Sequence, residues 1–149
     1  MGATYFAFGA NMAGDVMAGF CPGHRLLGIA ELPAHRLAFT RRSIRTGTGV
    51  ADVVPDAGHS VWGVVYELSD GDLDALDRKE GNGWAYERVS VAVRMVGEAA
   101  DVPALMYRVC EPEPAEVQPS AAYLDGLIAA AQERGLPPAY TAELEARRA

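Results

Sequence analysis

The stretch VADVVPDAGHSVWGVVYEL, residues 50–68, contains two segments typical of β-strands. VADVV and VWGVVYEL are rich in β-branched and aromatic residues, which are enriched in strands. Between them, PDAGHS at residues 55–60 carries the Pro, Asp, Gly and Ser residues that favour turns. The pattern predicts a β-hairpin whose turn lies at residues 55–60.

Further strand-like segments lie on both sides of this predicted hairpin. In residues 25–42 apolar and polar side chains alternate well enough to predict one strand or two, with Pro33 at a bend or an edge. Residues 41–49, RRSIRTGTG, are basic and rich in glycine, which is typical of a loop. Residues 86–96 and 103–109 are expected to form two more strands.

Helical signals are fewer. The only long helix is expected within residues 119–135, with Ser120 as N-cap and Gly135 at its end. Residues 69–80 predict a short helix that Gly81 ends, capped by Ser69 or Asp70, with Asp72 and Asp74 in its first turn for structural reasons. A short helical turn is expected within residues 11–23. Many strands with few helices predict an α+β fold around a strongly curved sheet or small barrel.

Composition excludes several classes of protein. The 149 residues are one domain's worth, so a single domain over residues 1–149 is expected. A formal net charge of −7 argues against nucleic acid or an anionic membrane as the main partner. No apolar run reaches the roughly 18 residues of a membrane span, and no secretory signal is visible. Cys21 and Cys110 stand far apart, which fits a reducing, cytoplasmic location.

Motifs for metals, nucleotides and serine nucleophiles are missing from the sequence. His24, His35 and His59 do not have the spacing of metal ligands, and there is no cysteine cluster for zinc. The glycine-rich phosphate motifs and the GxSxG elbow are also absent. We therefore expect no metal and no cofactor, and an enzyme of this sequence would need chemistry that requires neither.

The segment YFAFGANM, residues 5–12, pairs a strand-like start with a small turn. Tyr5 to Phe8 predict a buried strand, and Gly9 to Asn11 predict the turn. One interpretation is an ordinary tight turn. The other is a cradle in which backbone N–H groups bind an anion, with Gly9 allowing close approach and a backbone conformation that other residues avoid.

Glu80 lies in an unusual place for a carboxylate. It follows Leu73 and Leu76 at helical spacing, so it shares their apolar face, and it lies at the helix end where the dipole disfavours negative charge. Such a carboxylate suits general acid and base chemistry. The alternative is an ion pair with Arg88. Asp77 also shares the Leu73 face, so it is either a rival candidate or a group that holds the following loop in place.

Four segments, in the same order along the chain, resemble the γ-glutamylcyclotransferase family. Residues 5–12 resemble its YFAYGSN-type opening, and ALDRKEGNGWAYERVSV at residues 75–91 resembles its LD-x-x-EG segment followed by a Tyr and a strand. GLPPAY at residues 135–140 is similar to its closing GLP-x-x-Y signature, and residues 49–68 match in character. The resemblance runs from about Tyr5 to Leu144.

The resemblance implies a small mixed β-barrel flanked by helices and a catalytic role for Glu80. It also implies a reaction in which the α-amine of a γ-glutamyl group attacks its own γ-carbonyl, releasing 5-oxoproline and an amine or amino acid. The residues that it assigns to substrate binding are Tyr5, Phe6, Ala7, Phe8, Gly9, Ala10, Asn11, Tyr86, Tyr107 and Tyr123. The implied partner is a small γ-glutamyl compound, and a homodimer is compatible with the resemblance.

The sequence departs from the family pattern at two positions where a change can affect substrate choice and rate. Phe8 replaces the family's Tyr and Ala10 replaces its Ser, so the turn loses two hydroxyl groups. Two alternatives stay open: an enzyme of the same fold for a specialised γ-glutamyl amine, and a non-catalytic member that binds a small acidic metabolite or a partner protein. Residues 41–47 are either a solvated basic loop or a source of cations for an anionic leaving group.

Overall fold

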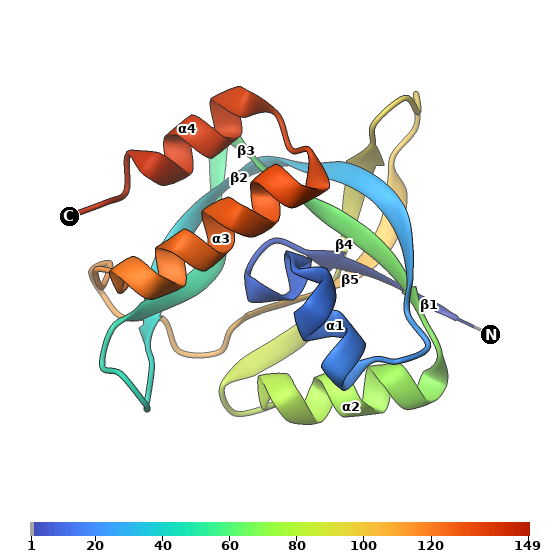
Figure 1. The fold of residues 1–149 in the computed structure, drawn as a ribbon, viewed down its shortest axis with the longest axis horizontal. Coiled ribbons are helices and arrows are strands. Elements are labelled where there is room, and N and C mark those ends of the chain that lie inside the picture. Colours follow the sequence, from blue (N-terminus) through green and yellow to red (C-terminus); the bar gives the residue numbers. More distant parts are fainter. Residues whose placement is uncertain (1) are drawn as a thin grey trace.

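A closed β-barrel forms the centre of the computed structural model, which describes residues 2–149 (Figure 1). Around the barrel the strand order is β1-β3-β2-β4-β5. The strands are β1 (Ala3–Ala7), β2 (Arg25–Arg42), β3 (Gly49–Leu68), β4 (Tyr86–Met95) and β5 (Val102–Val109). Only the β1–β5 contact is parallel among these described strands, and the other pairs are antiparallel. The predicted α+β fold with a small mixed barrel is therefore confirmed.

The longest hairpin of the barrel turns at a different place from the predicted one. β2 and β3 are single long strands, joined through residues 43–48. The predicted turn at residues 55–60 is wrong, because β3 continues through it and pairs with β2 on both sides. Pro33 pairs with Ser60 and His35 with Pro55, so the register shifts at this point and residues 56–59 of β3 have no partner on β2.

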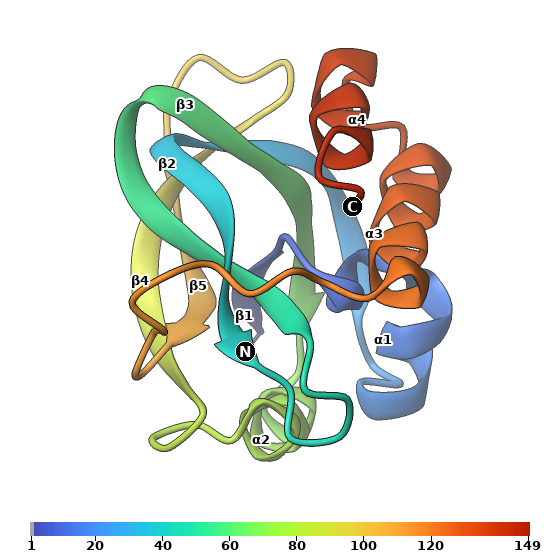
Figure 2. The ribbon, with the colours of Figure 1, turned by 90° about the vertical axis from the view of Figure 1, so that its left-hand side faces the viewer.

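Helices surround the barrel on one side and at one end (Figures 1 and 2). They are the short 3-10 helix η1 (Ala10–Met12) and the α-helices α1 (Gly14–Phe20), α2 (Asp70–Glu80), α3 (Ala121–Arg134) and α4 (Pro138–Glu145). Both predicted N-caps are present: the Ser69 side chain accepts the Asp72 N–H, and Ser120 accepts the Tyr123 N–H. α4 was not predicted, although Pro138 at its first turn is a typical helix start.

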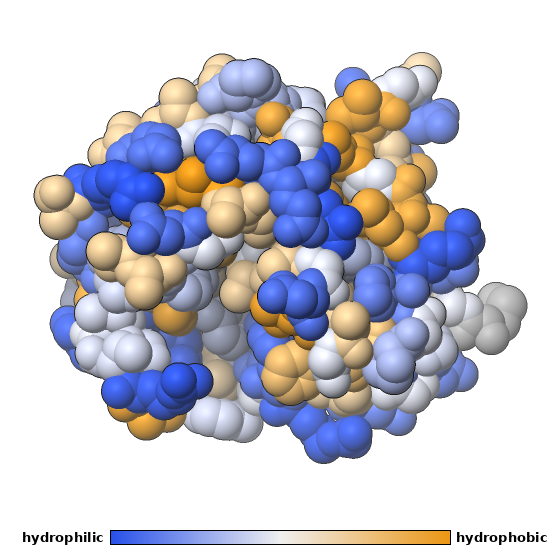
Figure 3. Space-filling model, in the orientation of Figure 1, coloured by the Kyte–Doolittle hydropathy of each residue, from blue (hydrophilic) through white to orange (hydrophobic). Residues whose placement is uncertain are grey.

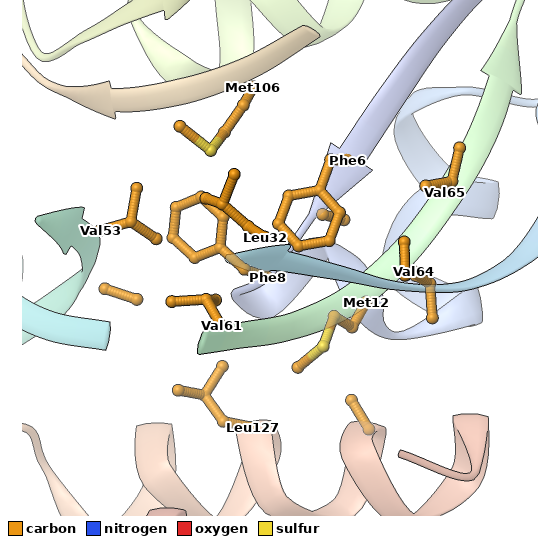
Figure 4. Close-up of a cluster of buried hydrophobic side chains, with 14 of the residues drawn as sticks. Phe6, Phe8, Met12, Leu32, Val53, Val61, Val64, Val65, Met106 and Leu127 are labelled. Atoms are coloured by element: carbon orange, nitrogen blue, oxygen red, sulfur yellow. The ribbon is translucent and has the colours of Figure 1, made fainter. Parts of the chain in front are cut away.

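The barrel interior and the inner face of α3 share one apolar core (Figure 4). Phe6 and Phe8 lie beside Leu32 within the barrel, and Leu127 reaches toward them from α3. Burial of each such side chain contributes about 1.5–3 kcal/mol. This core fixes the end of β1, and with it the start of the turn that follows.

Polar and charged residues cover much of the face shown in Figure 3, and apolar residues form separate groups on it. Among residues 2–149, no helix is long and apolar enough to cross a membrane.

Gly63 allows β1 to lie close against β3. A Cβ atom at this position would overlap the carbonyl oxygen of Ala7 and lie 2.9 Å from the Phe6 ring. We expect Gly63→Ala to lower the free energy of unfolding by about 1–3 kcal/mol, because overpacking moves the end of β1. Denaturant unfolding measures the effect.

Gly19→Ala is the matched control, since an added Cβ there would have no atom within 4 Å apart from its chain neighbours and the backbone of its own helix. It should leave stability unchanged or slightly higher, because alanine favours helices. A wild-type unfolding midpoint for Gly63→Ala would contradict this account of the β1–β3 contact.

Candidate active site

A cavity of about 330 Å³ opens between the turn after β1, the C-terminal end of α2 and the hairpin end of β2 and β3. Its wall includes Glu80 and every predicted substrate-binding residue except Phe6 and Ala7. The structure adds Arg41, Ser43, Val50, Ala51 and Lys79 to the wall. The structure thus brings the opening segment, Glu80 and the three predicted pocket tyrosines to one place.

Phe6 and Ala7 require a correction. Their side chains are 0% and 1% exposed and belong to the core. Their backbones are paired with Val65 and Val64 of β3. The predicted binding segment Tyr5–Asn11 therefore reaches the cavity only through Tyr5 and the residues from Phe8 onward.

The turn at Gly9–Met12 presents backbone donors that the protein does not use. The Met12 N–H donates to the Gly9 carbonyl and closes the turn. The N–H groups of Ala10 and Asn11 precede that bond, so they have no acceptor within the helix. Among residues 2–149 neither donates to another protein group. The turn therefore has the donors that an anion cradle requires.

Gly9 permits close approach to the turn, but its backbone does not need glycine for its φ angle. That φ is −115°, so the expectation of a conformation that other residues avoid is not met. A Cβ atom at Gly9 would lie 3.7 Å from the Ala51 Cβ and 3.8 Å from the Tyr123 hydroxyl, both in the cavity wall. A larger side chain at Gly9 would therefore occupy the cavity.

Tyr66 and Arg134 hold the turn from the side opposite its free amides. The buried Tyr66 hydroxyl lies 2.9 Å from the carbonyl oxygens of both Asn11 and Met12 and donates to them. The Arg134 guanidinium donates to the Met12 carbonyl and to the Tyr66 hydroxyl. Burial raises the pKa of Tyr66, which keeps this hydroxyl a donor.

Glu80 is the last residue of α2, and its side chain is 15% exposed. Leu76 on the same face is fully buried, as the spacing predicted. Gly81 follows in the left-handed conformation, with φ of 64°, and ends the helix. The predicted alternative partner is wrong, because Arg88 pairs with Asp77 and Glu80 pairs with Lys79.

Lys79 connects Glu80 to the turn. Its ammonium lies 3.0 Å from a Glu80 carboxylate oxygen and donates to the Asn11 side-chain oxygen at 2.8 Å. The Asn11 amide in turn donates to the Tyr5 hydroxyl at 2.9 Å. Burial, and then the nearby Glu80 charge, raise the pKa of Tyr5. The sequence analysis did not identify Lys79, because its role depends on contact with Asn11, which is 68 residues away along the chain.

The Asp77 carboxylate is bonded to two neighbouring side chains, and Asp77 does not line the cavity. Its carboxylate accepts the Tyr107 hydroxyl at 2.5 Å and the Arg88 guanidinium at 2.7 Å. Its carbonyl accepts the Asn82 N–H, which secures the loop after Glu80. These contacts agree with the second interpretation of the sequence, in which Asp77 holds the following loop in place.

Tyr86 and Tyr123 hold the peptide of Ala51 in the opposite wall. The Ala51 N–H donates to the Tyr123 hydroxyl at 3.0 Å, and the Tyr86 hydroxyl donates to the Ala51 carbonyl at 3.3 Å. Burial is the main cause that raises the pKa of Tyr123 to about 12, and burial also raises the pKa of Tyr86. Both phenols are therefore neutral at physiological pH.

Other reactive groups lie away from the cavity or serve the local fold. Burial in the core, together with the nearby Asp72 charge, raises the pKa of the Cys21 thiol to about 11. The Ser43 hydroxyl accepts the N–H groups of Arg45 and Thr46 within its turn. Over the described range 2–149, no three His, Cys, Asp or Glu side chains gather as metal ligands.

Comparison with known proteins supports the resemblance seen in the motifs. The model of the AIG2-like family matches residues 60–144. Gamma-glutamylcyclotransferases of Bos taurus and Homo sapiens are 28% and 29% identical to this chain, over 94% and 95% of it and 76% and 77% of their own lengths. A solved structure named gamma-glutamyl cyclotransferase has a TM-score of 0.90 at 26% identity, covering 98% of this chain and 88% of that one. The chain belongs to the AIG2-like family.

The tyrosines supply a test of how tightly the site and the adjoining core are packed. The protein has six, and each has a pKa above its usual value: Tyr5, Tyr66, Tyr86, Tyr107, Tyr123 and Tyr140. Because folding raises these values, the stability they contribute is complete below about pH 10, the unfolded value, and is lost as pH rises through the folded values.

We therefore expect little tyrosinate absorbance from the native protein at about pH 11, where unfolded tyrosine is mostly ionised. The guanidinium-unfolded protein should show full absorbance, and the free energy of unfolding should fall above about pH 10. Ordinary titration of most tyrosines in the native protein would contradict the buried phenols described above.

Proposed function

We propose that the protein is a γ-glutamylcyclotransferase that needs no cofactor and acts on a γ-glutamyl amino acid or amine. The α-amine of the glutamyl group attacks its own γ-carbonyl carbon. A lactam C–N bond forms, the original amide C–N bond breaks, and the departing nitrogen takes up the proton lost by the attacking amine. The products are 5-oxoproline and the released amine, and no water is consumed.

One observation carries the proposal: Glu80 lines the same cavity as Ala10 and Asn11, whose amides donate to no protein group among residues 2–149. A proton acceptor and a pair of fixed backbone donors are what this cyclisation requires. The relatives from Bos taurus and Homo sapiens, of whose lengths the match covers 76% and 77%, carry the corresponding name. Because nucleophile and electrophile belong to one substrate, the enzyme needs no nucleophile of its own, and folding the substrate supplies much of the acceleration.

Each group has a distinct role in the proposed mechanism. Glu80 takes a proton from the α-ammonium and later gives one to the leaving nitrogen. The amides of Ala10 and Asn11 bind an anionic oxygen of the substrate, either the α-carboxylate or the oxyanion that develops on the γ-carbonyl. Lys79 binds both Glu80 and Asn11, so it keeps the proton acceptor and the donor pair at a fixed position relative to each other.

Replacement of Glu80 tests the proton-transfer role. Glu80→Gln keeps size and polarity but cannot exchange a proton, so we expect turnover to fall about 10²-fold or more, with the thermal melt preserved. The measurement is 5-oxoproline released from a γ-glutamyl dipeptide. Glu98→Gln, on an exposed turn, is the control and should keep wild-type activity. Near wild-type release by Glu80→Gln would remove this carboxylate from the mechanism.

Replacement of Gly9 tests the cradle. A valine side chain would extend into the space between the turn, Ala51 and Tyr123. We expect Gly9→Val to impair binding and turnover far more than stability, with paired kinetics and thermal melts as the measurement. Ala10→Ser, which restores the family's hydroxyl, should have a mild effect by comparison. Full activity in Gly9→Val would show that the turn has only a structural role.

Independence from metals follows from the chemistry of an intramolecular aminolysis. We expect extensive dialysis against EDTA to leave the rate of 5-oxoproline release unchanged. A strong loss that a divalent metal restores would show that the proposed mechanism omits an essential ion.

A further inference from the structure

The charged side chains on the cavity wall carry a net positive charge. Arg41, Lys79 and Glu80 are the ionic residues that line the cavity. Lys79 and Glu80 neutralise each other at 3.0 Å. Among residues 2–149, Arg41 forms neither an ion pair with an acid nor a side-chain hydrogen bond. Among the described residues, the cavity therefore keeps one positive charge that no acidic side chain neutralises, a feature that favours a ligand with a surplus negative charge.

Aromatic rings hold the Arg41 side chain in place. Arg41 lies near the end of β2, where it pairs with Val50. Its guanidinium carbon lies 5.8 Å from the ring centroids of both Trp84 and Tyr86. Cation–π contact positions a guanidinium through its face and leaves the N–H groups in its plane free to donate. Arg41 is thus partly ordered before a ligand binds, and its donors are unused.

The two substrate types of the proposed reaction differ in charge. A γ-glutamyl amino acid carries two carboxylates and one ammonium at neutral pH, so it has a surplus negative charge. A γ-glutamyl derivative of a simple amine lacks the second carboxylate and is neutral overall. That second carboxylate belongs to the leaving group, and only the amino-acid substrate matches the surplus positive charge of the cavity.

The glutamyl half of either substrate already has binding groups at the other wall. Glu80 is the partner for its ammonium, and the amides of Ala10 and Asn11 are the donors for its anionic oxygen. Arg41 lies on the wall that Tyr86 and Ala51 form, and it shares no hydrogen bond with the Lys79–Asn11 contact. This arrangement leaves Arg41 for the other end of the substrate.

We propose that Arg41 binds the carboxylate of the leaving amino acid and so makes γ-glutamyl α-amino acids better substrates than γ-glutamyl amines. The inference rests on the proposed cyclotransferase function and names its substrate class. Arg41 is then a specificity-determining residue. Because its contact exists both before and during the reaction, its loss should act on KM more than on kcat.

The experiment compares γ-glutamylalanine with γ-glutamylethylamine, which differ by that single carboxylate. The wild type should have a higher kcat/KM for γ-glutamylalanine. Arg41→Gln should lower kcat/KM for this compound by about 10-fold to 10²-fold, the usual effect of a charged hydrogen bond, and leave γ-glutamylethylamine nearly unchanged. Arg41→Lys should recover part of the loss.

Arg42→Gln is the matched control, because the neighbouring Arg42 is exposed, donates to the Gly47 carbonyl and does not line the cavity. It should behave as the wild type on both compounds. Equal loss on both compounds in Arg41→Gln, or no loss on either, would overturn the role of Arg41 and leave the proposed function standing. Failure of the wild type to release 5-oxoproline from either compound would overturn the proposed function, and this inference with it.

Discussion

The hydrogen bonds from Tyr66 and Arg134 to the carbonyls of Asn11 and Met12 are the contacts on which the site depends. A turn of three residues with two unbonded amides has little stability of its own. Tyr66 from β3 and Arg134 from α3 bind the last two carbonyls of the turn. The Met12 and Ala13 N–H groups bind the Gly9 and Ala10 carbonyls, which share their peptide units with the amides of Ala10 and Asn11. The turn is thus held through four successive carbonyls, and this fixes the direction of the two amides that have no protein acceptor.

A second constraint brings the carboxylate to those donors. The helix α2 ends at Gly81, and this end lies beside the turn, so Glu80 meets the cavity at the terminus where the helix dipole opposes its charge. Lys79 offsets that cost through its ion pair and also binds Asn11. The proton acceptor and the donor pair are therefore coupled through one side chain, and Arg41 remains as the unpaired cation of the cavity.

Features with local causes could be predicted from the residues themselves, whereas the barrel and the residues that meet at the cavity were predicted through the family resemblance. Ser69, Ser120 and Gly81 act within a few residues of their own position, and each was correctly predicted. The turn residues at 55–60 gave a wrong hairpin, because pairing with β2 on both sides outweighed their local preference. Likewise the partner of Glu80 depends on which strands and helices meet, which spacing alone does not reveal. Residues 41–47 had two interpretations, a solvated loop or a source of cations, and only the fold shows that Arg41 lines the cavity.

The central claim is that the amides of Ala10 and Asn11 and the side chain at position 80 contact one bound substrate. Amide NMR of the Glu80→Gln variant, titrated with γ-glutamylalanine to saturation, tests it most directly. The account predicts that the amide resonances of Ala10 and Asn11 shift most strongly, while that of Gly97 on the far β4–β5 loop stays in place. Saturation with both turn amides unmoved would contradict the account.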